Sequence, residues 1–182
     1  MGDEMGGSGL VEIVIRRCGV EDAAVLALLG GATFLDAFSG MLPGRSIVEH
    51  CRVNHSAEAY AKYLSKPECR VWMAETVVEE GPVGYAMLTA PDLPVEVSGE
   101  DTELKRIYVL SRFHGSGTGK RLMEEAIAGA RGMGKKRLLL GVHEGNERAL
   151  GFYERAGFEV VGKRTFQMGF SVFEDLVLGL GL

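Results

Sequence analysis

The sequence predicts one α/β domain built around a mixed β-sheet. Apolar segments at 103–110 and 135–142 flank an amphipathic helical pattern, so they form a βαβ unit with parallel strands and a right-handed crossover. The apolar segments 70–78 and 82–91 are separated by a short turn, which predicts an antiparallel hairpin. A chain of 182 residues with 46% hydrophobic content can bury one core and needs no second domain.

The N-terminal half begins with a glycine-rich, acidic segment over 1–9, which we expect to be disordered, with the single domain over 10–182. The alternating residues 11–17 predict a strand. Residues 20–38 predict a helix, and residues 46–65 predict one or two more. Between the hairpin and the βαβ unit, residues 93–103 combine proline, glycine and acids, which is typical of a loop.

Composition excludes several classes of protein. The net charge of −5 argues against a nucleic-acid partner, because phosphate binding needs a basic surface. No apolar run reaches membrane-spanning length, and the N-terminus lacks the basic and apolar regions of a signal peptide, so we expect a cytoplasmic protein without a membrane partner. Cys18, Cys51 and Cys69 are widely spaced and form no CxxC pair, so we expect neither disulfides nor a metal site.

A glycine loop, residues 114–119 with the sequence HGSGTG, precedes the crossover helix that starts near Gly117. The first turn of a helix leaves backbone N–H groups unpaired, and glycine lets an anion approach them, so this loop predicts a phosphate site. A nucleoside-triphosphate loop would need glycine in place of His114 and a hydroxyl residue in place of Arg121. A dinucleotide loop would need a third glycine in place of Lys120. The sequence therefore favours a pyrophosphate held by backbone amides without metal.

Two motifs carry a resemblance to a known family. His114 to Gly119 resembles the Gln/Arg-x-x-Gly-x-Gly/Ala signature of the GNAT superfamily of N-acetyltransferases. Residues 146–158, NERALGFYERAGF, are similar to that superfamily's Asn-x-x-Ala-x-x-Phe-Tyr-x-x-x-Gly-Phe block. The segments TFLDAF, ELKRIYVL, GVHEGNERA and TFQMG followed by EDLVL resemble the bacterial spermidine/spermine N-acetyltransferases more closely.

The resemblance implies a central twisted mixed sheet flanked by helices, with a βαβ core that binds acetyl-CoA. It also implies acetyl transfer to a primary amine, so the expected partners are acetyl-CoA and a small amine. A homodimer is possible. The strand at Ile107 to Val109 would part from its neighbour and expose backbone N–H groups. The residues implied to bind the cofactor are Ile107, Tyr108, Val109, His114, Gly115, Ser116, Gly117, Thr118, Gly119, Lys120, Asn146 and Tyr153.

Tyr153 is the predicted proton donor to the departing thiolate. A phenol with a pKa near 10 can protonate a thiolate of pKa about 8.5 when a dry site offsets the small difference. The alternative is that Tyr153 and Phe152 only pack on the buried face of a helix that Ala149 and Ala156 share. Asn146 begins this helix and predicts an N-cap, to which the resemblance adds a contact with the cofactor.

Two residues are candidates for the general base that takes the proton of the amine. Glu103 lies at the head of the strand that lines the proposed acetyl site, and His143 lies just past the end of the neighbouring strand. Either could act directly or through water, and the histidine has the better reference pKa, near 6.5. His50 and His55 lack a second ligand at metal spacing, and we expect both at the surface.

A polyamine is the predicted acceptor. The resemblance implies it, and the acidic residues Asp36, Glu49, Glu58 and Glu75 could attract the extra ammonium groups of such a substrate. Two alternatives stay open. The acceptor could be another amine, such as a protein N-terminus, a peptide or a drug. A non-catalytic acyl-CoA sensor would keep the three loop glycines but would not need Tyr153.

Overall fold

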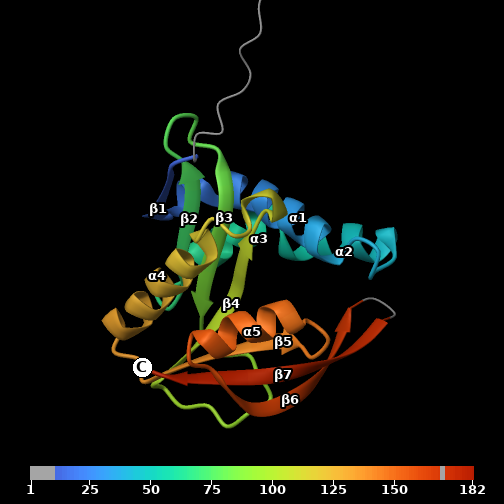
Figure 1. The fold of residues 1–182 in the computed structure, drawn as a ribbon, viewed down its shortest axis with the longest axis vertical. Helices are drawn as coiled ribbons and strands as arrows, with labels where there is room; N and C mark the ends of the chain where they lie inside the picture. Colours follow the sequence, from blue (N-terminus) through green and yellow to red (C-terminus); the bar gives the residue numbers. More distant parts are fainter. Residues whose placement is uncertain (1–10, 169–170) are drawn as a thin grey trace, which may run out of the picture.

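A seven-stranded mixed sheet in the order β1-β2-β3-β4-β5-β7-β6 forms the centre of the protein. The computed structural model describes residues 11–168 and 171–182, so the disorder predicted for residues 1–9 lies outside the described residues. Figure 1 shows the sheet with helices on both sides, which confirms the predicted fold class. None of the helices in the described ranges is long and apolar enough to cross a membrane.

Four strands form the N-terminal half of the sheet by antiparallel pairing. They are β1 (Ile13–Arg17), β2 (Arg70–Thr76), β3 (Pro82–Thr89) and β4 (Asp101–Val109). The predicted hairpin of β2 and β3 is confirmed. Along β2, Val71 and Met73 contribute to one core cluster and Trp72 and Ala74 to another. A strand that is apolar on both faces must be covered on both, and helices cover it here.

The face covered by α4 (Thr118–Gly132) and α5 (Glu147–Arg155) is called the first face below. Helix α4 forms where Leu122, Ala126 and Ala130 repeat every four residues, and all three are fully buried. The first face therefore carries the larger core cluster, which extends under both helices.

The opposite, second face has two separate covers. Helices α1 (Ala23–Phe38) and α3 (Ala57–Leu64) cover the N-terminal half, and α2 (Gly44–Asn54) packs against α1. Short 3₁₀ turns precede α1 at Val20–Asp22 and follow β4 at Ser111–Phe113. The loop of residues 90–100 covers the C-terminal half, where Leu93 and Val95 pack on Leu139 and Val177.

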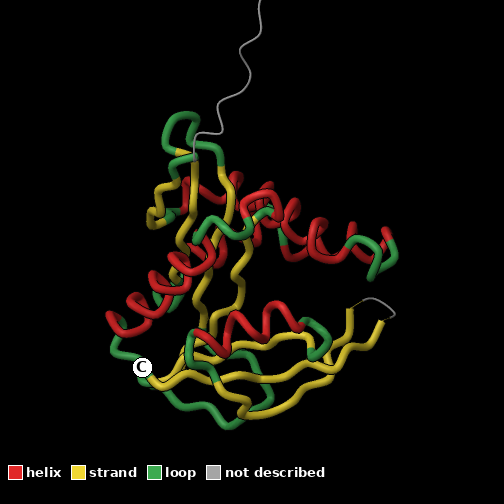
Figure 2. The backbone as a smooth tube through the Cα atoms, in the orientation of Figure 1, coloured by secondary structure: helices red, strands yellow, loops and turns green. Residues whose placement is uncertain are grey.

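The C-terminal half contains β5 (Arg137–His143), β6 (Glu159–Met168) and β7 (Ser171–Gly181). Strand β7 lies between β5 and β6 and pairs antiparallel with both. Strands β4 and β5 are parallel, as the βαβ unit predicts, but they pair only from Asp101↔Arg137 to Glu103↔Leu139. Beyond that point the strands part. In Figure 2 the two groups of strands run in different directions and meet near the start of β4.

Candidate active site

The glycine loop lies at the N-terminus of α4, as predicted. Gly117 is the N-cap residue and has a φ of 84°, and Gly115 has the same φ. Only glycine adopts this left-handed conformation readily, so these two residues give the loop its shape. A Cβ atom at either position would meet nothing within 4 Å, so the backbone of the loop is open to an approaching ligand.

The first turn of α4 supplies the N–H groups. The first i→i−4 bond of the helix runs from the Arg121 N–H to the Gly117 oxygen, at 3.1 Å, so the N–H groups of Gly119 and Lys120 have no acceptor within the helix. The Ser116 hydroxyl donates to the Phe113 oxygen at 2.6 Å and lies 2.8 Å from that of buried Thr118, which holds the loop against the fold. This arrangement is a backbone site for an anion.

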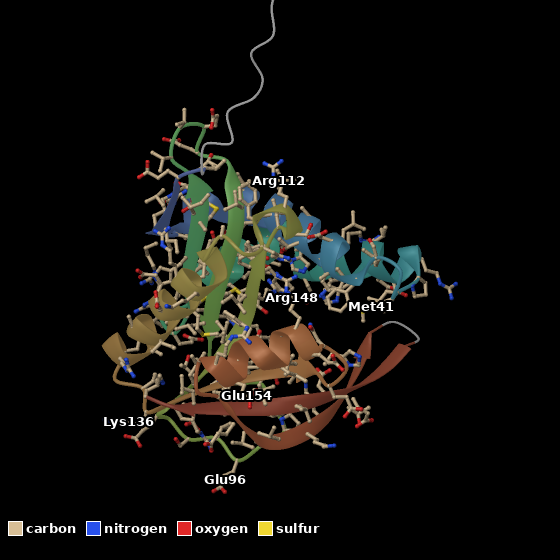
Figure 3. All side chains as sticks on the ribbon, in the orientation of Figure 1. Met41, Glu96, Arg112, Lys136, Arg148 and Glu154 are labelled. Carbon is tan, nitrogen blue, oxygen red and sulfur yellow. The ribbon has the colours of Figure 1, made fainter. Side chains whose placement is uncertain are left out.

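His114 and Arg148 connect the glycine loop to α5. His114 Nε2 lies 2.7 Å from the Val109 oxygen, and Arg148 Nη1 donates to His114 Nδ1 at 2.6 Å. These bonds require the neutral ring with its proton on Nε2. In Figure 3 Arg148 lies between α5 and the upper half of the molecule. Sequence reasoning missed Arg148, although it stands inside the 146–158 motif. Exposed Lys120 lies in the first turn of α4, 3.8 Å from Glu124. Lys120 and Arg148 are therefore two cations beside the loop.

The far half of β4 has one unpaired edge. Its residues Arg106 to Val109 pair with β3, whereas the ladder to β5 has already ended at Glu103. The side chains of Ile107 and Val109 pack against the core of the first face, and Tyr108 packs on the second face. The three residues predicted to expose backbone groups therefore lie where the strands part, with their side chains used for packing.

Helix α5 brings Asn146 and Tyr153 to the first face. The Asn146 side chain accepts from the Ala149 N–H at 3.1 Å, which confirms the predicted N-cap. The half-buried Tyr153 ring makes edge contacts with Phe152 and Phe158, with centroids 5.4 and 5.8 Å apart. Burial raises the pKa of the Tyr153 phenol well above its usual value, and nearby Tyr108 adds to this rise. Tyr153 therefore keeps its proton at neutral pH.

Glu103 lies on the second face, at the last residue pair before the strands part. Strand β4 begins two residues earlier than predicted, at Asp101, so Glu103 is inside the strand. Its carboxylate is buried, accepts from the Asp92 N–H at 2.7 Å and lies 3.3 Å from Lys105 Nζ. Glu103 is thus a buried carboxylate with two partners.

His143 is the last residue of β5 and belongs to a charged cluster on the second face. Its Nδ1 lies 3.1 Å from the backbone oxygen of Glu174 and 3.9 Å from Asp175 Oδ1. Buried Asp175 also binds Arg164, whose Nη2 lies 3.0 Å from Oδ2. A Cβ on Gly141 would lie 2.6 Å from Arg164 Nη2, so the absence of a side chain there makes room for the guanidinium. No sequence pattern singled out Asp175.

The four acidic residues expected to attract a polyamine do not gather at one place. Asp36 accepts from the Ser111 N–H at 2.9 Å, exposed Glu58 lies 2.8 Å from Lys62, and buried Glu75 lies 2.9 Å from Arg16. Glu49 is exposed on α2. Each of the first three already has a partner, so the four residues form no acidic cleft.

The surface position expected for His50 and His55 is wrong. His55 is 5% exposed, and its Nδ1 lies 3.0 Å from the Tyr60 hydroxyl. The His50 ring stacks on buried Phe34 with centroids 4.2 Å apart. Helices α2 and α3 turn these residues toward α1, a long-range contact that local spacing does not reveal. Within residues 11–168 and 171–182, no group of three His, Cys, Asp or Glu side chains is arranged to hold a metal ion.

Comparisons with known proteins agree with this geometry. A model of the Acetyltransferase (GNAT) family matches residues 41–158. An uncharacterized N-acetyltransferase of Mycobacterium tuberculosis is 34% identical over 158 residues, which cover 86% of this chain and 96% of the relative. A PaiA N-acetyltransferase from Thermoplasma acidophilum, solved in complex with coenzyme A, has a TM-score of 0.76 at 20% identity and covers 94% of this chain and 99% of its own.

Two more relatives match about half of the chain and differ in substrate. The peptidyl-lysine N-acetyltransferase YjaB of Salmonella typhimurium is 35% identical over 97 residues, which cover 53% of this chain and 55% of the relative. The spermine/spermidine N(1)-acetyltransferase of Bacillus subtilis is 29% identical over 102 residues, which cover 54% of this chain and 67% of the relative. These relatives agree on acetyl transfer to nitrogen and disagree on which amine receives it.

Proposed function

The chain belongs to the Acetyltransferase (GNAT) family and is an acetyl-CoA-dependent N-acetyltransferase, and we propose that its acceptor is a primary amine that attacks the thioester directly. The observation that carries the proposal is the parting of β4 and β5 after Glu103, next to the open backbone of the glycine loop. One opening then serves both reactants, with unpaired backbone for the thioester and an anion site for the pyrophosphate.

Backbone groups and cations would hold the cofactor. The N–H groups at the start of α4 suit a pyrophosphate, and Lys120 and Arg148 add positive charge beside it. Unpaired N–H groups along Ile107 to Val109 suit the pantetheine chain and the thioester oxygen. These groups are fixed before the ligand arrives, so they can stabilise the oxyanion of the tetrahedral intermediate without reorganisation.

We assign proton donation to Tyr153. It lies on the first face among apolar rings, and its raised pKa keeps the phenol protonated. A raised pKa makes the phenol a weaker acid, but the same dry surroundings also raise the basicity of the departing thiolate. The rise in the basicity of the thiolate therefore offsets part of the rise in the pKa of Tyr153.

Proton acceptance from the amine belongs to the second face, where Glu103 and His143 both lie. Glu103 is at the point where the strands part, and its carboxylate contacts the Asp92 N–H and Lys105 Nζ. His143 Nδ1 donates to the backbone oxygen of Glu174, which leaves Nε2 as the ring nitrogen that could accept a proton. Either group could receive the proton, directly or through water.

A polyamine acceptor stays a prediction. Its support is the sequence resemblance and the partial match to the spermine/spermidine acetyltransferase of Bacillus subtilis. The positions of Asp36, Glu49, Glu58 and Glu75 add nothing to it, because these carboxylates are dispersed and three of them are paired. A peptide or lysine side chain has comparable support from the peptidyl-lysine relative.

A panel of amines tests the proposal. The protein is mixed with acetyl-CoA and spermidine, a lysine-containing peptide or a monoamine, and free thiol is followed with EDTA present. We expect turnover of at least one amine without metal. Gly117→Val should weaken binding of coenzyme A in calorimetry, because its φ of 84° disfavours a branched side chain and the new Cβ would enter the open space before the loop. Tight binding of coenzyme A with no turnover of any amine would instead indicate the acyl-CoA sensor.

A further inference from the structure

Arg106 on β4 is a half-buried cation that forms no ion pair with the described carboxylates. Its guanidinium carbon lies 5.2 Å from the ring centroid of Tyr60 and 5.4 Å from that of Tyr63, so two rings of α3 pack on it. Its Nη1 atom is buried and has no hydrogen-bond partner among the described residues. Buried polar groups in folded proteins almost always have a partner, and an exception calls for an explanation, of which a bound anion is one.

The groups around Arg106 are neutral. Tyr60, Tyr63, Tyr85 and Tyr108 are the titratable neighbours that influence it most, and each is a phenol rather than a carboxylate. On the side of α2, burial and, to a smaller extent, the charge of Arg106 lower the pKa of His50 to about 4 and that of His55 to about 3. Both histidines are therefore neutral at pH 7. No described carboxylate forms an ion pair with Arg106, so its surroundings suit an anion from outside.

The position of Arg106 places it beside the opening between the strands. Arg106 and Tyr108 lie on the same strand, and both contribute to the second face. Tyr108 in turn lies close enough to Asp175 of β7 for the carboxylate to raise its pKa. At about 3.3 Å per residue, Arg106 is about 10 Å along the strand from Glu103, where the strands part. A small molecule bound between the parted strands can therefore reach from Glu103 to Arg106.

We propose that Arg106 binds a carboxylate of the acceptor, so that the preferred substrate is an amine that carries a carboxylate, such as an amino acid or a peptide. This inference rests on the proposed function. A carboxylate would satisfy Nη1 with a charge-assisted hydrogen bond, and the planar guanidinium matches its two oxygens. A polyamine places an ammonium group where Arg106 already supplies a positive charge, so the two predictions about the acceptor exclude each other.

Three matched acceptors test the inference. The probes are 6-aminohexanoate, its neutral amide 6-aminohexanamide, and pentane-1,5-diamine, which carries a second cation. We expect kcat/KM of the wild-type protein to be about 10- to 100-fold higher for the acid than for the amide, the range of one charged hydrogen bond. Arg106→Gln should reduce this ratio to near 1, and Arg106→Lys should keep part of it. Arg131→Gln on the exposed side of α4 is the matched control and should keep the wild-type ratio.

The outcomes are distinct. Equal efficiency for acid and amide in the wild-type protein, or preference for the diamine, would overturn the inference. So would a rate on the amide that inorganic phosphate raises in the wild-type protein but not in Arg106→Gln, because the occupant would then be a free anion. If Arg106→Gln fails to fold, the wild-type ratio and Arg106→Lys decide. If no probe is acetylated, the proposed function fails, and calorimetry of acid against amide with coenzyme A present still measures the preference.

Discussion

The Tyr153 hydroxyl lies on a side of α5 that is otherwise lined by apolar groups. Ala149, Leu150, Phe152 and Ala156 share this side and pack on the first face. A tyrosine used only for packing would lose little by becoming phenylalanine, because the change removes one oxygen and keeps the ring. Position 153 therefore allows a clean separation of packing from chemistry.

We predict that Tyr153→Phe lowers the single-turnover rate of acetyl transfer by about 10²- to 10⁴-fold, the range for loss of a general acid. Affinity for acetyl-CoA should stay close to wild type, because the ring contacts with Phe152 and Phe158 persist. Rapid-quench transfer and equilibrium calorimetry measure the two quantities. Unchanged transfer would return Tyr153 to a packing role, and a proportionate loss of affinity would make it a cofactor contact.

At the level of single residues, the sequence revealed the groups that stand in short motifs and missed those that meet through the fold. Asn146, Tyr153 and the loop glycines belong to two continuous segments, and their local roles follow from a helix start or a tight turn. Arg106 was predicted only as part of a strand, because its significance depends on rings from α3. Asp175 was not singled out, because its partners Arg164 and His143 come from two other strands.

Helix α1 contains two adjacent glycines in different surroundings. A Cβ on Gly30 would collide with the Tyr60 hydroxyl and His55 Nδ1, whereas a Cβ on Gly31 would meet nothing within 4 Å. The Tyr60 hydroxyl donates to that of Tyr85 at 2.8 Å, so Gly30 allows α1 to approach a buried polar chain that joins α3 to β3. Glycine is thus required for close packing at position 30 and not at position 31.

We predict opposite effects for the two alanine variants. Gly30→Ala should lower the free energy of unfolding by about 1–3 kcal/mol, because it overpacks the contact between α1 and α3. Gly31→Ala should raise it by about 0.5–1 kcal/mol, because alanine favours the helix. Urea denaturation measures both, and Gly31→Ala serves as the control for the general effect of the substitution. Equal changes in the two variants would show that α1 does not contact α3 as described.

Elements with a clear period were predictable, and so was the pairing of strands that follow one another in the chain. The buried repeat of α4 and the hairpin of β2 and β3 follow from local patterns, and both are confirmed. The early start of β4 at Asp101 was missed, because Asp101 and Thr102 are polar. Both are nevertheless buried, and the Asp101 carboxylate binds Arg137 of β5 at 2.7 Å. A strand that is stabilised by an ion pair to its neighbour carries no apolar signal.

The whole molecule should lose stability on mild acidification because of His50 and His55. Burial lowers their pKa values to about 4 and about 3, whereas the unfolded chain binds protons near pH 6.5. Their contribution is therefore fully present above pH 6.5 and is lost as the pH falls toward 3. Arg16 lowers the pKa of Asp22, and Arg137 lowers that of Asp101. The stability that these carboxylates contribute is therefore lost only below about pH 4.

We predict that the free energy of unfolding decreases between pH 6.5 and 4, with a slope for each histidine below about 1.4 kcal/mol per pH unit, since His50 is partly exposed. The double variant His50→Gln/His55→Gln should have a flatter profile in this window and the wild-type profile below it. Urea denaturation at several pH values measures the slopes. A wild-type profile that is already flat from pH 6.5 to 4 would contradict the assignment.

The overall architecture was predictable where neighbouring elements of the fold also follow one another in the chain. The parallel βαβ unit contains the glycine loop and lies within about 40 residues of sequence. Local patterns therefore define the half of the site that faces α4 and α5. The second face brings together α2, α3, β4, β6 and β7, which are distant in sequence. Their apposition depends on the twist of the sheet and on the loop of residues 90–100, and no short segment encodes either.

The two faces of the sheet have consequences for how this chain can diverge. The cofactor contacts proposed here belong to the glycine loop, β4 and α5, whereas Arg106, Glu103 and the Asp175 cluster lie on the opposite face under separate covers. Substitutions in α2, α3 or the loop of residues 90–100 can thus reshape the second face and leave the packing of α4 and α5 intact. Descendants of this sequence can exchange one amine for another over evolutionary time while the acetyl donor stays the same.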